Sequence, residues 1–423
     1  MAPVASCGHS FEAMGYKSPL SEKEKILYLT RNGLCDPLGY SQVLRYLLRL
    51  DNRFEIRIIS FESRENFDSG NVESVRKELS ARSVHWNPLK ANRRGWLPGV
   101  CISVLKMMML VAFSRLCGYR IFHCRSYVPA FIGLLFSLCF GSKLIFDMRG
   151  FWVDELCASG RIVPHSISYK ILRFLESAVV NRADAIVVLT YVARNFLSNK
   201  YSKEVGERTY VISTCVDRTR FLVPANRDLI GESENNLVFS VVGTISSGWF
   251  DRDRLASWID VCLSNYKDSV FKIVSLDSSL VIENFVFKYD LRRFGQRIVH
   301  SPVEPKDIPN ELCTHHLSGI FYSGFGRSEL GRAPTKIGEL LAAGVPFVIS
   351  PGIGDIDHIL TNYRVGELIN GEGDLLAATE RALLTRNKKQ FLKQCNFALE
   401  NYFSLESATK CLENIYSTMQ FKD

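Results

Sequence analysis

The sequence predicts an α/β protein of two domains, each built around a parallel β-sheet, and two observations lead to this prediction. Short apolar runs rich in β-branched residues alternate with longer segments of helical periodicity, as is typical of right-handed βαβ units. The alternation stops in a polar stretch near the middle of the 423 residues and then begins again, and one hydrophobic core rarely organises a chain this long. We therefore expect two Rossmann-like, doubly wound domains that face a central cleft.

The domain boundaries follow from where this alternation starts and stops. We expect a disordered or loosely held tail over 1–24, an N-terminal domain over 25–216, a linker over 217–236, a C-terminal domain over 237–403 and a last helix over 404–423 that packs back toward the N-terminal domain. The first residues lack the apolar segment of a secretory signal peptide, which supports the prediction of a tail.

Each predicted strand is a short apolar run bounded by turn residues or by the start of a helix. In the N-terminal domain we expect strands at 25–30, 55–61, 84–89, 120–124, 143–147, 185–189 and 210–213, with helices at 41–50, 97–117, 129–140, 167–182 and 190–201. In the C-terminal domain we expect strands at 237–242, 271–276, 297–300, 319–322 and 347–350, and a final helix at 404–419. The strands are apolar on both faces, so both sheets should be parallel and covered by helices.

The composition is that of a well-packed globular protein, with 47% hydrophobic and 23% charged residues. The twelve cysteines occur singly, without C-x-x-C pairs or the spacings of zinc sites. Together with the missing signal peptide, this pattern predicts reduced thiols and a cytoplasmic protein.

Positive charge is concentrated in one stretch, because residues 76–125 hold ten basic side chains and a single acidic one, Glu78. Trp86, Trp96 and the methionines at 107–109 lie among these charges. Basic and aromatic residues together favour a membrane surface over a nucleic-acid footprint. An ordinary solvated basic face is the remaining alternative.

We therefore expect a peripheral contact with an anionic membrane through residues 86–118, on the cytoplasmic face, and no nucleic-acid partner. The most apolar long stretch, 100–116, contains Lys106 and is shorter than the ~20 residues of a membrane span. It predicts a packed or interfacial helix and not a transmembrane one.

The most informative stretch is GRAPTKIGELLAAGVPFVISP, residues 331–351. Pro334 favours a helix start, Gly344 favours its end, and the apolar run that follows predicts a buried strand. Lys336 and Glu339 lie three residues apart near the start of this helix. A helix N-terminus suits a phosphate, to which the lysine adds a cation, and the carboxylate can accept hydrogen bonds from sugar hydroxyls. The alternative is a weak, solvent-exposed Lys336–Glu339 pair.

The string PTKIGELLAAGVPFVIS resembles the nucleotide-sugar motif of retaining glycosyltransferases with the GT-B fold, in particular glycosyltransferase family 4. In that family a carboxylate on this helix holds the ribose of the nucleotide, and a nearby basic group meets the diphosphate. The resemblance implies the first role for Glu339 and a catalytic, charge-stabilising role for Lys336 and Arg332. It also places Thr335 in the donor site.

The chain departs from the family's E-x7-E pattern at its first glutamate. Gly331 stands at that position, with Glu329 close by. The resemblance otherwise extends over nearly all of residues 25–420, and the stretch described above is its most specific part.

Ligands of open α/β sheets bind beyond the carboxyl ends of the strands, so the segments that follow strands are candidate sites. The loop after the first strand of the C-terminal domain, GTISSG, has the small residues of a phosphate-binding loop. Its predicted donor contacts are Gly243, Thr244, Ser246 and Ser247. Many family members carry an arginine and a lysine near this loop; here the nearest basic residues are Arg252 and Arg254, so the phosphate charge is assigned to Arg332 and Lys336.

The loop over 32–39 after the first strand contains two glycines and a proline but no G-x-G-x-x-G fingerprint, which disfavours dinucleotide binding. It resembles the N-terminal loop of these glycosyltransferases, and DPLGYSQV resembles the version in envelope-polysaccharide members. Gly39 would let the substrate approach the backbone. The alternative is a plain turn.

His123 and Arg125 stand at the end of the fourth predicted strand. The resemblance implies that His123 faces the donor sugar as a catalytic residue and that Arg125 meets phosphate or acceptor. A lone histidine at such a place is otherwise a structural residue.

The segment DMRGFWVDE follows the fifth predicted strand and resembles bacterial family 4 enzymes that build lipopolysaccharide or capsule. Its polar and aromatic residues are candidates for binding the acceptor: Asp147, Arg149, Trp152, Asp154 and Glu155. The structural alternative is an Asp147–Arg149 ion pair at the end of a buried strand.

The resemblance implies metal-independent transfer of a sugar from a nucleotide-diphosphate donor to a glycan or lipid-linked hydroxyl, with retention at the anomeric carbon. No cofactor is expected, and no D-x-D cluster follows a strand. Two alternatives stay open: a non-hydrolysing nucleotide-sugar epimerase of the same fold, and a catalytically silent binding scaffold.

Overall fold

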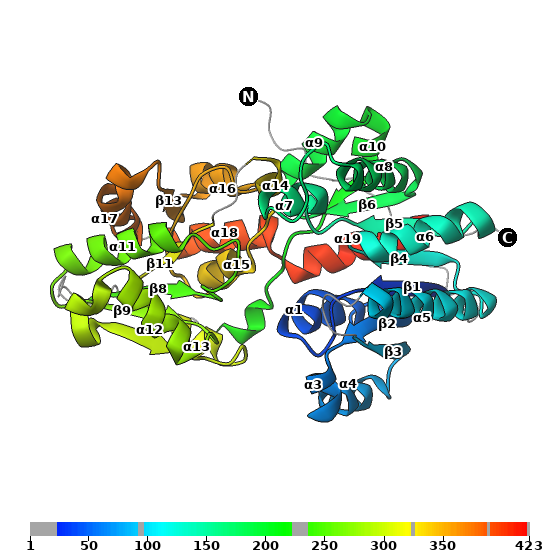
Figure 1. The fold of residues 1–423 in the computed structure, drawn as a ribbon, viewed down its shortest axis with the longest axis horizontal. Helices are drawn as coiled ribbons and strands as arrows, with labels where there is room; N and C mark the ends of the chain where they lie inside the picture. Colours follow the sequence, from blue (N-terminus) through cyan, green and yellow to red (C-terminus); the bar gives the residue numbers. More distant parts are fainter. Residues whose placement is uncertain (1–22, 92–96, 222–235, 323–325, 387–389, 421–423) are drawn as a thin grey trace.

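The computed structural model describes residues 23–91, 97–221, 236–322, 326–386 and 390–420, which form two α/β domains joined near the middle of the molecule (Figure 1). The predicted tail up to residue 22, most of the predicted linker and Trp96 lie outside the described residues.

The N-terminal domain is built on a parallel sheet of seven strands in the order β3-β2-β1-β4-β5-β6-β7. The strands are β1 (Glu24–Thr30), β2 (Phe54–Glu62), β3 (Val84–Lys90), β4 (Ile121–Arg125), β5 (Lys143–Asp147), β6 (Ala185–Val188) and β7 (Thr209–Val211). All seven lie where the apolar runs predict them. The central strand β1 pairs with β2 on one side and with β4 on the other.

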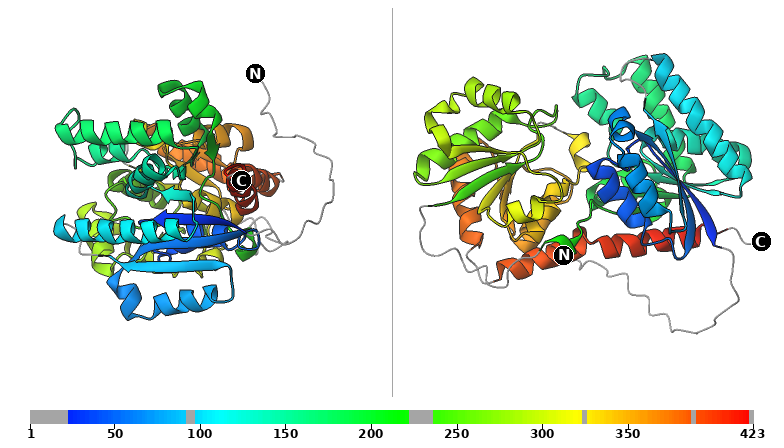
Figure 2. Two further views of the ribbon diagram at one scale, coloured as in Figure 1. Left: turned by 90° about the vertical axis from the view of Figure 1, so that its right-hand side faces the viewer. Right: turned by 90° about the horizontal axis from the view of Figure 1, so that it is seen from below.

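Helices cover both faces of this sheet (Figure 2). They are α1 (Pro37–Gly39), the π-helix η1 (Tyr40–Leu44), α2 (Arg45–Leu47), α3 (Arg64–Asp68), α4 (Asn71–Leu79), α5 (Leu97–Leu116), α6 (Tyr127–Phe140), α7 (Trp152–Ala158), α8 (Ile167–Arg182), α9 (Tyr191–Lys200), α10 (Lys203–Glu207) and the 3-10 turn η2 (Arg218–Arg220). The helix predicted at 41–50 begins earlier, at Pro37, because proline is well suited to the first helical position.

The C-terminal domain has a six-stranded parallel sheet in the order β10-β9-β8-β11-β12-β13. Its strands are β8 (Val238–Val242), β9 (Val270–Val274), β10 (Ile298–Ser301), β11 (Leu317–Ile320), β12 (Phe347–Ile349) and β13 (Gly366–Leu368). Five of them were predicted. The sixth, β13, is only three residues long and begins with glycine, so it lacks the apolar, β-branched pattern of its neighbours.

The helices of this domain, with the 3-10 turns η3 and η4, pack around the sheet. They are α11 (Arg252–Asn265), α12 (Ser279–Lys288), η3 (Leu291–Arg297), α13 (Ile308–Leu312), α14 (Arg327–Leu330), α15 (Thr335–Ala342), α16 (Ile356–Tyr363), η4 (Glu372–Asp374), α17 (Leu375–Arg386) and α18 (Phe391–Tyr402). Within the described parts of the chain, no helix is both long and apolar enough to cross a membrane.

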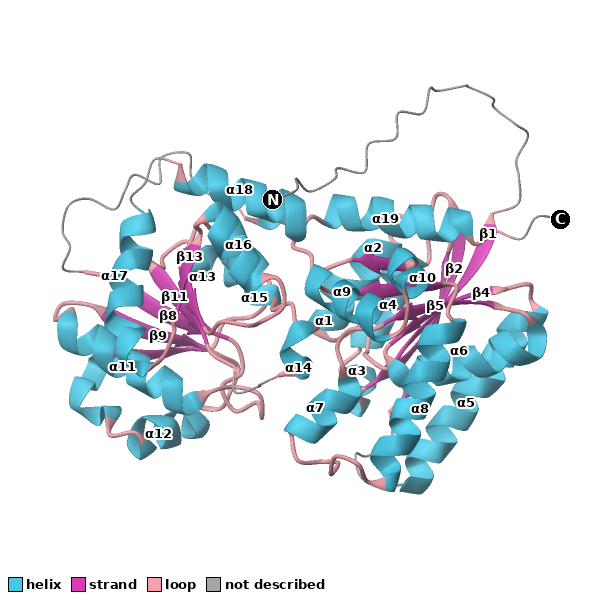
Figure 3. Ribbon diagram, turned by 90° about the horizontal axis from the view of Figure 1, so that it is seen from above, coloured by secondary structure: helices cyan, strands magenta, loops and turns pink. Residues whose placement is uncertain are grey.

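The two domains are joined at two neighbouring crossings of the chain. The N–H of Val216, where the chain leaves the first domain, donates to the carbonyl of Phe403, where it returns, at 3.0 Å. Beyond that point α19 (Leu405–Thr418) lies along the N-terminal sheet, and Leu412, Ile415 and Tyr416 complete one of its cores (Figure 3). The final helix therefore belongs structurally to the first domain.

Further hydrogen bonds close the junction between the domains. The hydroxyl of Thr190, after β6, donates to the carbonyl of Leu330 at 2.6 Å. The carboxylate of Asp355 in the C-terminal domain accepts from the N–H groups of Tyr191 and Val192 at 2.8 and 3.0 Å. Asp355 thereby serves as an acceptor for the free N–H groups at the start of α9.

Candidate functional site

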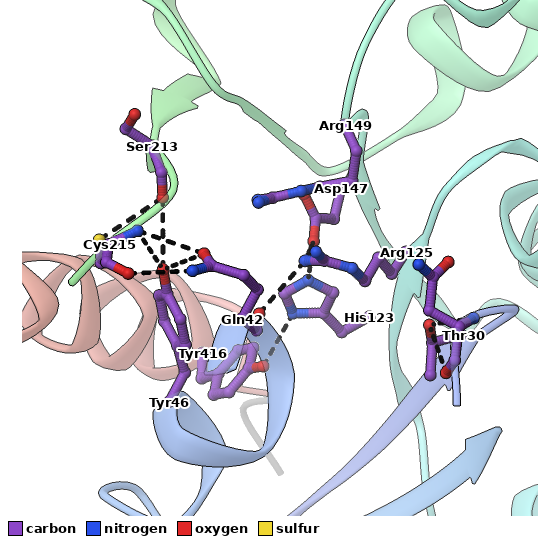
Figure 4. Close-up of polar contacts among 11 residues, drawn as sticks. Thr30, Gln42, Tyr46, His123, Arg125, Asp147, Arg149, Ser213, Cys215 and Tyr416 are labelled. Atoms are coloured by element: carbon purple, nitrogen blue, oxygen red, sulfur yellow. Dashed lines mark hydrogen bonds and ion pairs between the residues drawn. The ribbon is translucent and has the colours of Figure 1, made fainter. Parts of the chain in front are cut away.

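At the carboxyl ends of β4 and β5, four predicted residues meet in one buried cluster (Figure 4). The carboxylate of Asp147, which is only 3% exposed, accepts from Arg125 Nη1 at 3.1 Å and from Arg149 Nη1 at 3.4 Å. His123 Nε2 lies 3.6 Å from the same carboxylate. The Asp147–Arg149 pair of the structural alternative is therefore present, with Arg125 as a second cation.

The charges of this cluster determine its protonation state. Burial acts to raise the pKa of Asp147, but the guanidinium groups of Arg149 and Arg125 outweigh it and hold that pKa well below its usual range. Burial lowers the pKa of His123, although Asp147 acts in the opposite direction. At neutral pH the cluster thus holds an ionised Asp147, a neutral His123 and two charged arginines.

His123 is fixed from its other side by the last helix. Its Nδ1 lies 2.8 Å from the hydroxyl of Tyr416 in α19, and its ring centroid lies 4.4 Å from that of Tyr28. Its Nε2 has no hydrogen-bond partner among the described residues. These are the surroundings expected of a buried structural histidine, so its catalytic role stays a prediction.

Gln42 connects this cluster to the segment that leaves the domain (Figure 4). Its amide donates to the carbonyl of Cys215 at 2.9 Å, and its own backbone carbonyl accepts from Arg125 at 3.4 Å. A cavity of about 20 Å³, room for one water molecule, lies between these groups and Tyr46. Gln42 and Tyr46 lie on the η1–α2 segment, and no sequence signal separates them from ordinary helix residues.

Gly39 lies in the loop where we predicted a close approach of substrate, but the close approach is made by the chain itself. A Cβ atom at this position would collide with the carbonyl oxygen of Gly33. The loop is also held by Glu62, whose carboxylate accepts from the N–H groups of Leu34 and Cys35 at 2.7 and 3.3 Å. Packing within the domain accounts for the glycine.

Two of the predicted acceptor residues, Asp154 and Trp152, contact neighbouring helices of the N-terminal domain, and their role toward an acceptor stays a prediction. Asp154 forms an ion pair with Arg173 at 2.5 Å. Trp152 is partly buried: its ring packs against that of Tyr127, with centroids 5.3 Å apart, at the edge of the hydrophobic core. Sequence spacing shows neither contact, because both partners lie on other helices.

Glu155, the third acceptor candidate on α7, lies at the junction of the domains. Burial raises its pKa, Arg332 acts to lower it, and Glu329 adds to the rise. Arg332 Nη2 forms an ion pair with Glu329 Oε1 at 3.2 Å, and its guanidinium lies 4.8 Å from the centroid of the Tyr322 ring. In the described part of the chain, Glu329 Oε2 and Arg332 Nη1 are buried without a hydrogen-bond partner. This junction cluster therefore has unused donor and acceptor capacity.

Gly331 lies at a tight contact between the two domains. A Cβ atom at this position would lie 3.1 Å from the ring of Phe151 and 3.2 Å from Gly150 Cα, both in the N-terminal domain. A larger side chain would push the two domains apart. The carboxylate nearest in sequence, Glu329, is buried in the junction cluster two residues earlier.

Helix α15 has the structure that its sequence predicts. Pro334 precedes its first residue, Thr335, and Gly344 follows its end with a φ of 63°. Lys336 Nζ lies 2.7 Å from Glu339 Oε2, with the two side chains 31% and 20% exposed. The pair of the structural alternative is present, and its partial exposure leaves both groups accessible to a ligand.

The loop after β8 is held by a carboxylate that sequence reasoning did not include. Asp277 accepts from the N–H groups of Ile245 and Ser246 at 2.7 and 3.3 Å and from the Ser246 hydroxyl at 2.5 Å. Burial acts to raise the pKa of Asp277, but the hydrogen bonds from Ser246 and Ser275 lower it below its usual value. Both donors of Ser246 are engaged with Asp277 here, and its role toward the donor substrate stays a prediction. Asp277 follows β9, and this position after a strand is the sequence signal that could have identified it as a candidate site residue.

The other residues of this loop are arranged differently. Gly243 has a φ of 128°, which favours glycine, and the Ser247 hydroxyl donates to the Thr244 carbonyl at 2.9 Å. Arg254, in the first turn of α11, donates to the Ser350 hydroxyl beyond β12 at 2.8 Å. Arg254 thus adds a cation at the carboxyl end of this sheet, where we had assigned the charge to Arg332 and Lys336.

No family model matches this chain, and a search of curated proteins finds no match. Solved structures resemble it over nearly its whole length. Sucrose-phosphate synthase from Thermosynechococcus elongatus matches with a TM-score of 0.69 at 13% identity, over 94% of this chain and 99% of that chain. Anabaena HepE in complex with UDP and glucose matches with a TM-score of 0.65 at 14% identity, over 93% and 100%.

A third structure, a UDP-N-acetylglucosamine 2-epimerase described as putative, from Listeria monocytogenes, matches with a TM-score of 0.60 at 14% identity, over 95% of this chain and 98% of that chain. Identities this low establish the fold alone. Two parallel-sheet α/β domains together with these neighbours show that the chain has the GT-B fold. Among the described residues, no group of three His, Cys, Asp or Glu side chains could hold a metal ion.

Proposed function

We propose that the protein is a retaining, metal-independent glycosyltransferase of the family 4 type, which moves a hexose from a nucleotide-diphosphate donor to a hydroxyl of a glycan or lipid-linked acceptor. The observation that carries this proposal is α15, which presents Lys336 in its first turn and Glu339 one turn later, beside the junction of two GT-B domains. HepE, which shares the fold, is described as bound to UDP and glucose, and this supports a nucleotide-sugar donor.

In the proposed reaction, the bond between the anomeric carbon and the donor phosphate breaks, and a bond from that carbon to the acceptor oxygen forms on the same face. The acceptor proton passes to the leaving diphosphate. Negative charge grows on that diphosphate, so fixed cations and the N-terminus of α15 stabilise the transition state. Lys336 and Arg332 supply this charge, and Glu339 holds the ribose.

We place this activity in the synthesis of cell-envelope polysaccharide or lipopolysaccharide, in the cytoplasm and in peripheral contact with an anionic membrane. The envelope assignment rests on the resemblance of the segments DPLGYSQV and DMRGFWVDE. A lipid-linked acceptor requires such a contact, because its hydroxyl lies at the surface of the bilayer.

An epimerase is the second candidate, since the Listeria monocytogenes structure has the same fold. An epimerase converts its nucleotide sugar without an acceptor. Product analysis in the presence and absence of glycan or lipid-linked acceptors therefore distinguishes the two activities.

The donor site is tested by thermal unfolding of the purified protein with a panel of nucleoside diphosphates and their sugars. A ligand that binds only the folded state raises the melting temperature by mass action. We expect one nucleotide base to raise it and Glu339→Ala to abolish that rise.

The control is Glu406→Ala, because Glu406 forms a lysine pair of the same length with Lys410 on α19, at 2.7 Å, although that pair is more exposed. This variant should keep the full rise in melting temperature. If no nucleotide changes the melting temperature of the wild-type protein, the proposal is wrong and a silent scaffold is favoured.

A further inference from the structure

The N-terminal domain turns a large apolar surface to solvent on the side of α5, α6 and α8. Each of these helices carries a row of exposed apolar side chains. We call this surface the three-helix face, and its residues are Ile102, Leu105, Met109, Phe113 and Leu116 of α5, Leu135 and Leu138 of α6, and Ile167, Ile171 and Phe174 of α8. Leu116, Ile167 and Phe174 are 87%, 78% and 72% exposed.

The exposed rows lie opposite the rows that bind the sheet. In α5, Met107 and Val111 are buried in the core, while Met109 and Phe113 point the other way. A helix that is apolar on all sides is normally covered on all sides. Half of α5 is uncovered in this structure, and contiguous exposed apolar patches of this kind mark interaction surfaces.

The three helices form one continuous layer and not three separate ridges (Figures 1 and 3). Arg115 of α5 donates to the carbonyl of Phe140 at the end of α6, at 3.3 Å. The hydroxyl of Tyr127 in α6 donates to the buried carboxylate of Glu176 in α8, at 3.0 Å. Their apolar rows therefore belong to the same surface.

The charges on this side of the domain are positive. The sequence has no Asp or Glu between Glu78 and Asp147, nor between Glu155 and Glu176, and these two stretches contain α5, α6 and the start of α8. Glu176 is buried and paired with Arg173 and Lys200. Among the described residues, the exposed charged side chains on these helices and in their connecting loops are Lys106, Arg120, Arg161 and Lys170.

An apolar face can be covered by a second copy of the chain or by a membrane, and the positive charge distinguishes these two possibilities. A symmetric contact with a second copy would bring the same lysines and arginines against one another, which is unfavourable. An anionic bilayer offers the opposite charge together with an apolar interior for the exposed side chains. The face is therefore complementary to anionic lipid.

A cavity of about 370 Å³ opens beside the three-helix face, between α5, α4 and the edge strand β3. Phe113 lines this cavity and also belongs to the face, and Arg57, Arg76 and His85 contribute basic groups. The guanidinium of Arg57 lies over the rings of Tyr119 and Phe113, at 4.6 and 5.6 Å, and its Nε is buried without a hydrogen-bond partner in the described residues.

Two carboxylates near the cavity partly neutralise its positive charge. Glu73 pairs with Arg76 at 2.6 Å, and Glu55 lies 3.9 Å from His85. Glu55 accepts from the Tyr119 hydroxyl at 2.6 Å, while Arg57 has the hydroxyl of Ser114 as a neutral partner at 3.4 Å. Arg57 is thus the group best placed to donate a hydrogen bond to a phosphate oxygen.

We propose that the three-helix face docks on an anionic bilayer and that the adjoining cavity takes the phosphate of a lipid headgroup through Arg57. This proposal deepens the membrane contact of the proposed function and rests on it. It extends the stretch predicted from the sequence, 86–118, to α6 and α8. It also corrects that prediction at Met107, which faces the core.

The test is flotation of the full chain with vesicles of phosphatidylcholine, with and without phosphatidylglycerol. We expect flotation only with phosphatidylglycerol and less of it at high salt. A variant with Met109→Gln and Phe174→Gln should bind at least about tenfold more weakly, because each change removes one large apolar group from the contact. Both side chains are exposed, so folding should be unaffected.

The matched control carries Leu280→Gln and Phe287→Gln, which replace two equally exposed apolar residues of α12 in the C-terminal domain. It should float like the wild-type protein. Arg57→Gln should reduce the preference of the protein for vesicles that contain phosphatidylglycerol, and Arg76→Gln, at a more exposed position, serves as a second variant. Inorganic phosphate added to the wild-type protein should not cause the same loss of preference.

Equal flotation with both vesicle types would overturn the proposal. Undiminished flotation of the variant with Met109→Gln and Phe174→Gln would also overturn it. A concentration-dependent dimer in sedimentation that the same variant abolishes would assign the face to a second copy. The nucleotide-dependent rise in melting temperature is measured without lipid, so a failure of membrane docking and a failure of the proposed donor site are told apart.

Discussion

The charged groups at the carboxyl ends of the two sheets differ in how they are held. In the N-terminal domain, the buried carboxylate of Asp147 accepts from Arg125 and Arg149, and His123 Nε2 lies 3.6 Å from it. In the C-terminal domain, Lys336 and Glu339 form a partly exposed pair on one helix. Groups bonded to each other in the interior maintain the fold, whereas a surface pair can exchange its partner for a ligand at small cost.

Asp147→Asn tests the buried cluster of this comparison. It has the largest expected effect on the free energy of unfolding. The substitution leaves the buried guanidinium of Arg125 and the partly buried guanidinium of Arg149 without a carboxylate, so we expect the free energy of unfolding to fall by about 3–5 kcal/mol. Urea denaturation at pH 7, followed by circular dichroism, measures the change.

The control for this substitution is Glu207→Gln, which removes the carboxylate of an exposed pair with Lys203. It should change the free energy of unfolding by less than about 1 kcal/mol. An equally small effect of Asp147→Asn would mean that the buried cluster does not stabilise the domain.

Lys336→Ala tests the exposed side and comes next in size. We expect kcat/KM for sugar transfer to fall by about 10²–10³, because a cation that stabilises the leaving diphosphate is lost. The free energy of unfolding should change by less than about 1 kcal/mol, since the lost pair is partly exposed. Lys410→Ala, in the comparable pair on α19, serves as the control. Unchanged turnover in folded Lys336→Ala would remove Lys336 from the proposed mechanism.

The smallest predicted effect is on the pH dependence of stability, through His123. Its pKa in the folded protein lies below the value of about 6.5 expected in the unfolded chain. As the pH falls below about 6.5, the unfolded chain binds a proton that the folded protein does not. The free energy of unfolding should therefore decrease, by at most about 1.4 kcal/mol per pH unit from this group.

His123→Gln should remove this part of the slope. Asp147 does not contribute in this range, because its pKa is held far below pH 5 by the arginines. Comparing urea denaturation of wild type and variant at pH 5 and 6.5 isolates the contribution of His123 from those of other groups. The exposed His358→Gln is the control, and identical slopes in all three proteins would argue against a buried neutral His123.

Much of the fold could be predicted because its signal is local. Seven strands of one sheet and five of the other are apolar runs, and α15 has its proline and glycine at the predicted ends. The strand β13 was missed, since GEL has no such pattern. Periodicity also could not show which side of the wholly apolar α5 meets the sheet, so Met107 and Met109 were grouped although they face opposite ways.

The site was less accessible to prediction, because its deciding contacts join residues far apart in the chain. Spacing places Asp147 and Arg149 at a strand end, but it does not show Tyr416 of the last helix against His123. The loop after β8 has the composition of a phosphate-binding loop, yet Asp277 occupies two of its N–H groups. Similarly, the sequence does not show that a Cβ atom at Gly331 would lie against the ring of Phe151.

The return of α19 to the first domain has a consequence for how the protein is made. One of the two cores of the N-terminal domain contains Leu405, Leu412, Ile415 and Tyr416, which the ribosome adds only after the entire C-terminal domain. Domains of a nascent chain generally fold in the order of their synthesis. Here the first domain emerges with one face of its sheet incomplete, and the second domain is the first whose core is fully available. The two halves of the protein therefore reach their final packing almost together, and a chain interrupted before α19 would leave the N-terminal core exposed to aggregation.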